Sequence, residues 1–205
     1  MLGKHGRGVS GRIFGPVAQW LLRRGIGPNT VSITGTVAAI VAALALLGTG
    51  RLVIGPIAIG LILLTDSLDG IMARQGPGPT DFGSFLDSTL DRLADAAVFL
   101  GLVIYFVRFT EGPVSGYGVV AATVCMALAM TVSYARAKAE SLGRTAGVGL
   151  AERADRLVVA LAAALAVGLG LSPWLLVVVL GLLALASAVT VTQRIVAVWR
   201  QGEAR

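Results

Sequence analysis

The sequence predicts an all-α membrane protein in which six transmembrane helices follow an N-terminal amphipathic helix at the membrane interface. Hydrophobic residues make up 56% of the 205-residue chain, and the mean hydropathy is +0.83. Several long runs hold no charge, which excludes an ordinary soluble globule. The length allows one domain, which we expect to be a membrane domain over residues 1–205.

The segment before the first span, residues 1–28, is basic and amphipathic. Its first 24 residues hold five Lys or Arg residues and no acid. Its apolar residues recur at helical spacing: Ile13, Phe14, Val17, Trp20 and Leu21. This pattern is typical of a helix lying in the lipid headgroup layer. A signal peptide is the alternative, but Gly15, Pro16 and Gln19 interrupt the apolar run and no small-residue cleavage site follows.

Turn residues and charges divide residues 29–199 into six expected spans. Their approximate bounds are 29–47, 52–74, 84–108, 117–139, a fifth that begins near Leu150 and is followed by an outer turn at Gly168, Gly170, Ser172 and Pro173, and 174–199. Asn29 is the expected N-cap of the first span, and residues 111–116 form an outer loop. Both termini then lie in the cytosol, and only Arg51 and Arg108 of the 17 Lys and Arg residues lie outside, as the positive-inside rule requires.

Acidic residues concentrate at the ends of the second and third spans. Six of the eleven lie there: Asp66, Asp69, Asp81, Asp87, Asp91 and Asp95. Ionisable groups at membrane depth are costly and by default mark a functional site. On helices, Asp66 and Asp69 share one face, and so do Asp87 and Asp91.

Four carboxylates held so close would repel one another unless cations lay among them. Oxygen ligands select hard ions such as magnesium or manganese, so the pattern predicts a two-metal site. The alternative is a structural salt-bridge cluster with Arg74 and Arg92, although two arginines cannot neutralise five or six carboxylates.

Eight residues fit the spacing D-x2-D-G-x2-A-R-x8-G-x3-D-x3-D without a gap: Asp66, Asp69, Gly70, Ala73, Arg74, Gly83, Asp87 and Asp91. This spacing resembles the signature of the CDP-alcohol phosphotransferases. The resemblance covers essentially the whole chain. It implies a polytopic membrane enzyme, and a homodimer, that joins a CDP-linked lipid to an alcohol and releases CMP.

The resemblance also implies roles for single residues. Asp66, Asp69, Asp87 and Asp91 are expected to bind two Mg²⁺ ions, with Mn²⁺ as a possible substitute, and Asp91 to take the proton from the attacking hydroxyl. The residues expected to bind CDP-diacylglycerol are Asn29, Thr30, Ser32, Gly70, Ala73, Arg74, Thr80 and Gly83. Gly70 and Gly83 suit close approach of the ligand because glycine has no Cβ, whereas Asn29 could be only a cap.

Three further motifs bear on the acceptor alcohol. D-S-T-L-D-R-L-A-D-A-A-V-F at 87–99, S-Y-A-R-A-K-A-E at 133–140 and E-R-A-D-R at 152–156 resemble prokaryotic family members that attach inositol phosphate to CDP-diacylglycerol. We expect the acceptor phosphate to be bound by Arg136, Lys138, Arg153 and Arg194, because guanidinium groups bind phosphate in two-point geometry.

The alternative acceptor is glycerol 3-phosphate, although the D-P-x-A-D-K usual in those relatives is absent. Some of these cations could instead be positive-inside anchors.

Other protein classes fit less well. A divalent-cation transporter would place carboxylates near the membrane midplane on broken helices, often in paired repeats, and no repeat is visible. The net charge of +6 is typical of cytosolic loops facing anionic lipid, so we expect no nucleic acid partner. Cys125 lies in an apolar run and is expected to be a buried, free thiol. We therefore expect a multi-pass protein of the cell membrane whose active site faces the cytoplasm.

Overall fold

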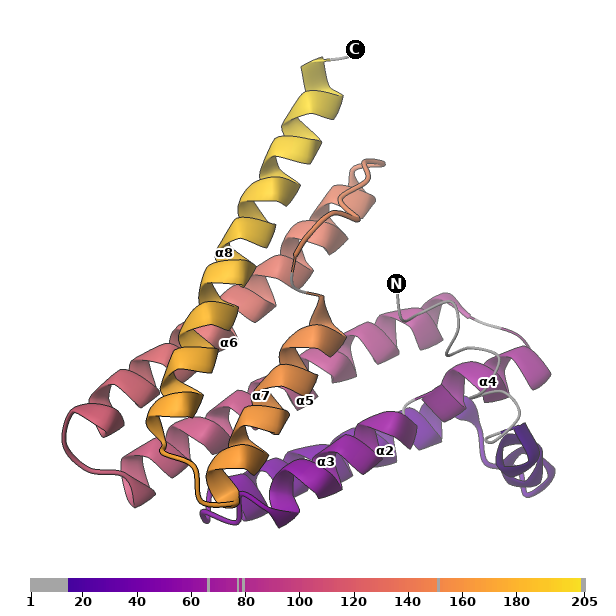
Figure 1. Ribbon diagram of the computed structural model, residues 1–205. Coiled ribbons are helices and arrows are strands. Elements are labelled where there is room, and N and C mark those ends of the chain that lie inside the picture. The colour runs from indigo at the N-terminus through magenta and orange to yellow at the C-terminus, as the bar shows by residue number, and fades with distance from the viewer. Residues whose placement is uncertain (1–14, 66, 77, 79, 151, 204–205) are drawn as a thin grey trace. The chain divides into compact units, whose positions relative to one another are not determined.

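The structure is a computed structural model that describes residues 15–65, 67–76, 78, 80–150 and 152–203. These residues form helices and turns, with no strand among them (Figure 1). They fall into two compact units. Within the described residues, the first unit comprises the chain up to Ala42 together with Ala58–Ala94, and the second comprises Ala43–Ile57 and Asp95–Arg205.

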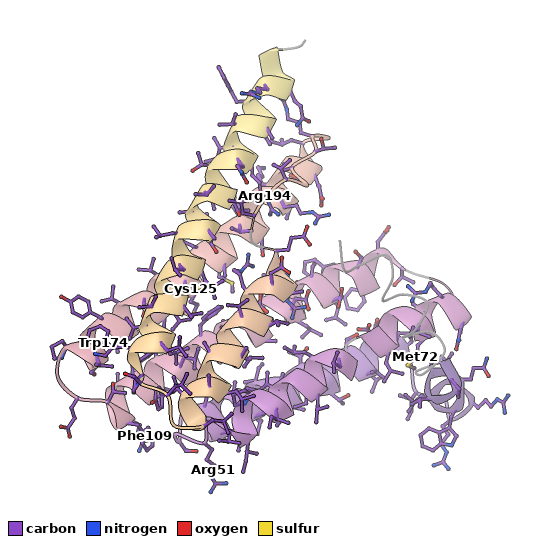
Figure 2. All side chains as sticks on the ribbon, in the orientation of Figure 1. Arg51, Met72, Phe109, Cys125, Trp174 and Arg194 are labelled. Atoms are coloured by element: carbon purple, nitrogen blue, oxygen red, sulfur yellow. The ribbon has the colours of Figure 1, made fainter. Side chains whose placement is uncertain are left out.

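The first unit holds α2 (Pro28–Ala42), most of α3 (Ile54–Thr65), α4 (Ser67–Gln75) and the first half of α5 (Asp81–Phe109). Helix α2 packs against α4. Residues 15–23 form a short helix before α2. Its Ala18 is fully buried in an apolar cluster with Leu68, Ile71 and Met72 of α4, and Figure 2 labels Met72.

The opposite side of the 15–23 helix is exposed. Trp20 is 51% exposed, and the Arg24 guanidinium lies 4.4 Å from the centre of the Trp20 ring. The 15–23 helix therefore has one buried and one exposed apolar face, and its place at the membrane interface stays a prediction. Ile13 and Phe14, which also belong to the predicted pattern, lie outside the described residues.

The second unit holds η1 (Ala43–Leu47), the start of α3, the second half of α5, and α6 (Gly112–Ser141), α7 (Arg153–Gly168) and α8 (Trp174–Glu203). Helix α8 packs against both α6 and α7. Glycines let backbones approach closely: a Cβ on Gly101 would lie 2.6 Å from the Ala43 carbonyl oxygen, and one on Gly168 would lie 2.5 Å from the Leu52 carbonyl carbon. Cys125 is buried and free, as expected.

The predicted starts of three helices, α2, α6 and α7, need correction. Helix α2 begins at Pro28, and the Gly27 carbonyl accepts a hydrogen bond from the Thr30 amide at 3.1 Å. Gly27 is therefore the N-cap and Asn29 lies inside the first turn, because proline fits the first helical position, where no amide is needed. For the same reason Pro113 starts α6 early, so the predicted 111–116 loop is largely helical. Helix α7 begins at Arg153 rather than near Leu150.

Within the described part of the chain, four helical segments are long and apolar enough to cross a membrane: Pro28–Leu47, Ile54–Gln75, Gly112–Ser141 and Trp174–Gly202. The chain is therefore an all-helical membrane protein. Helix α5 carries its acidic residues between Asp81 and Asp95. Helix α7 has 16 residues, which span only about 24 Å at 1.5 Å per residue. The six-span count stays a prediction.

Candidate functional site

A pocket of about 360 Å³ lies in the first unit, where the first turns of α2 and α5 meet α4. Its lining residues are Gly27, Pro28, Asn29, Ser32, Asp69, Gly70, Ala73, Gly78, Thr80, Gly83, Ser84 and Asp87. Six of the eight residues predicted to bind CDP-diacylglycerol are among them; the other two, Thr30 and Arg74, have exposed side chains outside the lining. Two of the four predicted metal ligands, Asp69 and Asp87, also line the pocket.

Asp69 is held by two hydrogen bonds at the wall of this pocket. The Ser32 hydroxyl donates to Asp69 Oδ2 at 2.5 Å, and the Gly70 amide donates to Asp69 Oδ1 at 2.5 Å. Ser32 is buried on α2, so helix α2 fixes a carboxylate that α4 carries. The sequence assigned Ser32 only to the nucleotide, and no local pattern links two residues 37 positions apart.

Thr80 is the N-cap of α5. Its hydroxyl oxygen accepts a hydrogen bond from the Gly83 amide at 3.0 Å, and its carbonyl accepts one from the Ser84 amide at 3.0 Å. A Cβ on Gly83 would lie 3.0 Å from Thr80 Oγ1 and 3.4 Å from Asn29 Oδ1. Glycine at position 83 thus keeps open the space between the first turns of α2 and α5. The pocket is bordered by two helix N-termini, which favour anions.

Gly70 differs from the packing glycines of the second unit. A Cβ there would meet only Arg74 Nη1, at 3.8 Å, and the residue lines the pocket. No neighbour within the described chain requires a glycine at this helical position. Because glycine weakens a helix relative to alanine by about 0.5–1 kcal/mol, packing within the described chain does not account for this residue, and its contact with a ligand stays a prediction.

The remaining signature carboxylates are placed as follows. Asp91 lies one turn after Asp87 on α5, has a side chain 17% exposed, and has its Oδ2 3.3 Å from Arg92 Nη2. Asp66 lies outside the described residues. Among the residues that are described, no three His, Cys, Asp or Glu side chains form a metal-binding group. The two pocket carboxylates, Asp69 and Asp87, are hard oxygen donors of the kind that suits magnesium or manganese.

Arg194, which Figure 2 labels, forms a basic cluster in the second unit with Arg136 and Arg156. Arg194 is buried on α8 and interacts electrostatically with Arg136 and Arg156 and with the acids Glu140 and Glu152. Its Nε donates to the Val148 carbonyl at 3.0 Å, and its Nη1 to the Val132 carbonyl at 2.5 Å. Arg194 therefore also joins α6, α8 and the loop before α7.

The other predicted acceptor residues differ in exposure. Arg136 and Lys138 are exposed, and Arg136 Nε lies 2.8 Å from Glu140 Oε1. Arg153 Nε lies 2.9 Å from Oδ1 of the buried Asp95. The predicted set omitted Arg156, which is only 1% exposed. The signal for it was present, since Arg153 and Arg156 are three residues apart on α7 and share a face.

Comparison with known proteins identifies the family. The model of the CDP-alcohol phosphatidyltransferase family matches residues 26–151. The chain therefore belongs to this family, which confirms the resemblance read from the eight spaced residues. The matched region includes every residue that lines the pocket.

Individual relatives extend the likeness over nearly the whole chain. The chain is 46% identical over 198 residues to the phosphatidylinositol phosphate synthase of Mycobacteroides abscessus, covering 97% of this chain and 89% of that protein. It is 45% identical over 210 residues to the synthase of the same name from Cutibacterium acnes, covering 98% and 99%.

Two crystal structures of Mycobacterium tuberculosis phosphatidylinositol phosphate synthase are similar to this structure at 38% identity. The one with bound CDP-diacylglycerol has a TM-score of 0.86 and covers 92% of this chain and 94% of that one. The one with manganese and citrate has a TM-score of 0.83 and covers 91% and 88%.

Proposed function

We propose that this protein transfers the phosphatidyl group of CDP-diacylglycerol to a hydroxyl of inositol phosphate, giving phosphatidylinositol phosphate and CMP. The observation that carries the proposal is the pocket in which residues of the aspartate signature meet two helix N-termini. Relatives named phosphatidylinositol phosphate synthase match 97% and 98% of the chain. A similar structure holds CDP-diacylglycerol, which supports the same lipid substrate here.

The pocket suits the CDP part of the lipid. The first turns of α2 and α5 favour the negative diphosphate, and Gly70 and Gly83 leave room for it. Asp91 accepts the proton of the acceptor hydroxyl. The hydroxyl oxygen then forms a bond to the phosphorus that carries diacylglycerol, and the bond from that phosphorus to CMP breaks. Arg74, one turn beyond Gly70, is proposed to contact the diphosphate.

The protein requires a divalent metal, as its family and the manganese in a similar structure indicate. We assign Asp66, Asp69, Asp87 and Asp91 as its ligands, for two Mg²⁺ ions or Mn²⁺. When bound, the metal would neutralise the diphosphate and stabilise charge on the departing CMP. The chain itself orients the carboxylates by hydrogen bonds, as the Ser32 hydroxyl does for Asp69.

The basic cluster of the second unit is the proposed site for the acceptor phosphate. Arg136 and Arg194 interact electrostatically, as expected for two sides of an anion site. Cations gathered at membrane depth are costly unless they meet an anion, and a phosphorylated alcohol supplies one. We assign Arg136, Lys138, Arg153 and Arg194 to this site and add Arg156.

We further propose six spans, a single functional domain and a homodimer in the cell membrane, with the site facing the cytoplasm. The family match runs across both compact units, which supports one functional domain. Free cytosolic inositol phosphate can reach a cytoplasmic site, whereas the acyl chains of the lipid stay in the bilayer.

The test measures CMP release by the purified protein in lipid vesicles with CDP-diacylglycerol and Mg²⁺. Inositol phosphate, free inositol and glycerol 3-phosphate are supplied in separate reactions. We expect release with inositol phosphate and complete loss after a chelator is added. Release with glycerol 3-phosphate alone would assign the chain to that acceptor. Divalent-cation flux into vesicles without any CMP release would indicate a transporter instead.

A further inference from the structure

Asp95 is a buried acid that the eight-residue signature does not include. It lies on α5, one helical turn after Asp91, and is 1% exposed. Positions four apart share a helix face, so Asp95 continues the line begun by Asp87 and Asp91. A carboxylate at such depth is costly unless it has a specific partner.

One partner is Arg153, at the first position of α7. Arg153 Nε lies 2.9 Å from Asp95 Oδ1, and the two residues are 58 positions apart in the chain. The side chain of Asp95 is 2% exposed and that of Arg153 is 27% exposed. In contrast, Arg136 and Glu140 are neighbours on one helix with side chains 56% and 55% exposed. Solvent screens such an exposed pair, whereas the Asp95–Arg153 pair joins two helices in a part-buried setting.

Stability alone is a weak reason for such a pair. Removing two charges from water costs about as much as their attraction returns, so a buried ion pair is often no more stabilising than an apolar pair of similar volume. The pair does, however, fix orientation. A carboxylate bound at Nε sets the plane and direction of the guanidinium, and the end-on edge formed by Nη1 and Nη2 is the one that binds phosphate in two-point geometry.

We propose that Asp95 is a positioning residue for the acceptor. Through its bond to Arg153 Nε, it orients the Nη1–Nη2 edge of the Arg153 guanidinium toward the phosphate of the incoming alcohol. This inference rests on the proposed function. Because Asp95 follows Asp91 by one turn of α5, a single helix carries both the proposed base and the residue that orients the acceptor.

The first test is Asp95→Asn, which keeps the shape of the side chain and removes its charge. We expect the KM for inositol phosphate to rise about tenfold, as for loss of one charge-assisted hydrogen bond. The KM for CDP-diacylglycerol, the kcat and the Mn²⁺ affinity should stay within about twofold of the unmodified protein. The matched control is Asp155→Asn, which removes an exposed acid two residues from Arg153 and should change none of these constants.

The second test asks whether Asp95 acts through Arg153. We expect Arg153→Gln to raise the same KM, and the double variant Asp95→Asn/Arg153→Gln to raise it no further, because coupled residues are not additive. If Asp95→Asn fails to fold, Asp95→Glu keeps the charge but shifts the carboxylate by one methylene, and it should raise the KM for inositol phosphate alone.

Three results would overturn the inference: an unchanged KM for inositol phosphate, additive effects in the double variant, or weaker Mn²⁺ binding in Asp95→Asn. The last would place Asp95 at the metal instead. Failure of the proposed function is a separate result, since the unmodified protein would then release no CMP with inositol phosphate.

Discussion

Replacing Gly70 by Ala should make the protein more stable and less active. Within the described chain a Cβ at this position meets only Arg74 Nη1, at 3.8 Å, which is ordinary van der Waals contact. The hydrogen bond from the residue 70 amide to Asp69 Oδ1 is kept. Alanine therefore gains about 0.5–1 kcal/mol of helix stability over glycine. For a chain of this size that corresponds to a melting temperature about 1–4 °C higher.

The same methyl group would occupy space in the pocket. Forcing an added methyl against a closely bound ligand costs about 1–3 kcal/mol, which is about a 5- to 150-fold rise in the KM for CDP-diacylglycerol. Helix stability and lipid binding therefore move in opposite directions, which general damage to the fold cannot produce.

Two measurements check this prediction: melting followed by tryptophan fluorescence in detergent, and CMP release at varied CDP-diacylglycerol concentration. The matched control is Gly60→Ala in α3, where a Cβ meets nothing within 4 Å and the residue does not line the pocket. It should show the stability gain with an unchanged KM. An unchanged KM in Gly70→Ala would refute the assignment of this glycine to the ligand, and a lower melting temperature would refute the open space beside it.

Three further substitutions test other parts of the site. Ser32→Ala removes the bond to Asp69 Oδ2 and should weaken Mn²⁺ binding about 10- to 100-fold in an electron paramagnetic resonance titration; Thr34→Ala, whose hydroxyl bonds only its own helix, should not. Asp91→Asn should lower kcat by orders of magnitude while the KM for CDP-diacylglycerol changes little, and survival of single-turnover chemistry would contradict its role as base. Arg194→Gln should raise the KM for inositol phosphate and also lower the melting temperature, because two bonds to backbone carbonyls are lost; a lower melting temperature alone would indicate a purely structural residue.

Much of the helical framework follows from local sequence. Charge-free runs and glycine or proline turns predict helices where the described residues contain α2, α3, α5, α6, α7 and α8, with α8 beginning at Trp174 as expected. The errors fall at the starts of helices. Pro28 and Pro113 were assigned to the turns before helices, whereas each lies in a first helical turn, because proline is compatible with that turn and with a loop alike.

Some contacts had no local signal. Gly101 permits the close approach to the Ala43 carbonyl, which also accepts a hydrogen bond from the Gly48 amide in the π-helical turn η1. Nothing in the sequence 43–47 distinguishes this turn from ordinary α-helix. Likewise, the pairs Ser32–Asp69 and Asp95–Arg153 join distant positions, and their formation depends on how helices cross.

The sequence by itself determined the family, the membrane setting and the identity of the signature residues, because fixed spacing and hydropathy are properties of the chain alone. Only the tertiary structure decided which of those residues share a pocket and which neighbouring groups orient their side chains. In that structure the Ser32 hydroxyl bonds Asp69, a pocket lies between the first turns of α2 and α5, and Arg153 pairs with Asp95. A side chain's direction is set by the helix packed against it, and that helix comes from elsewhere in the chain.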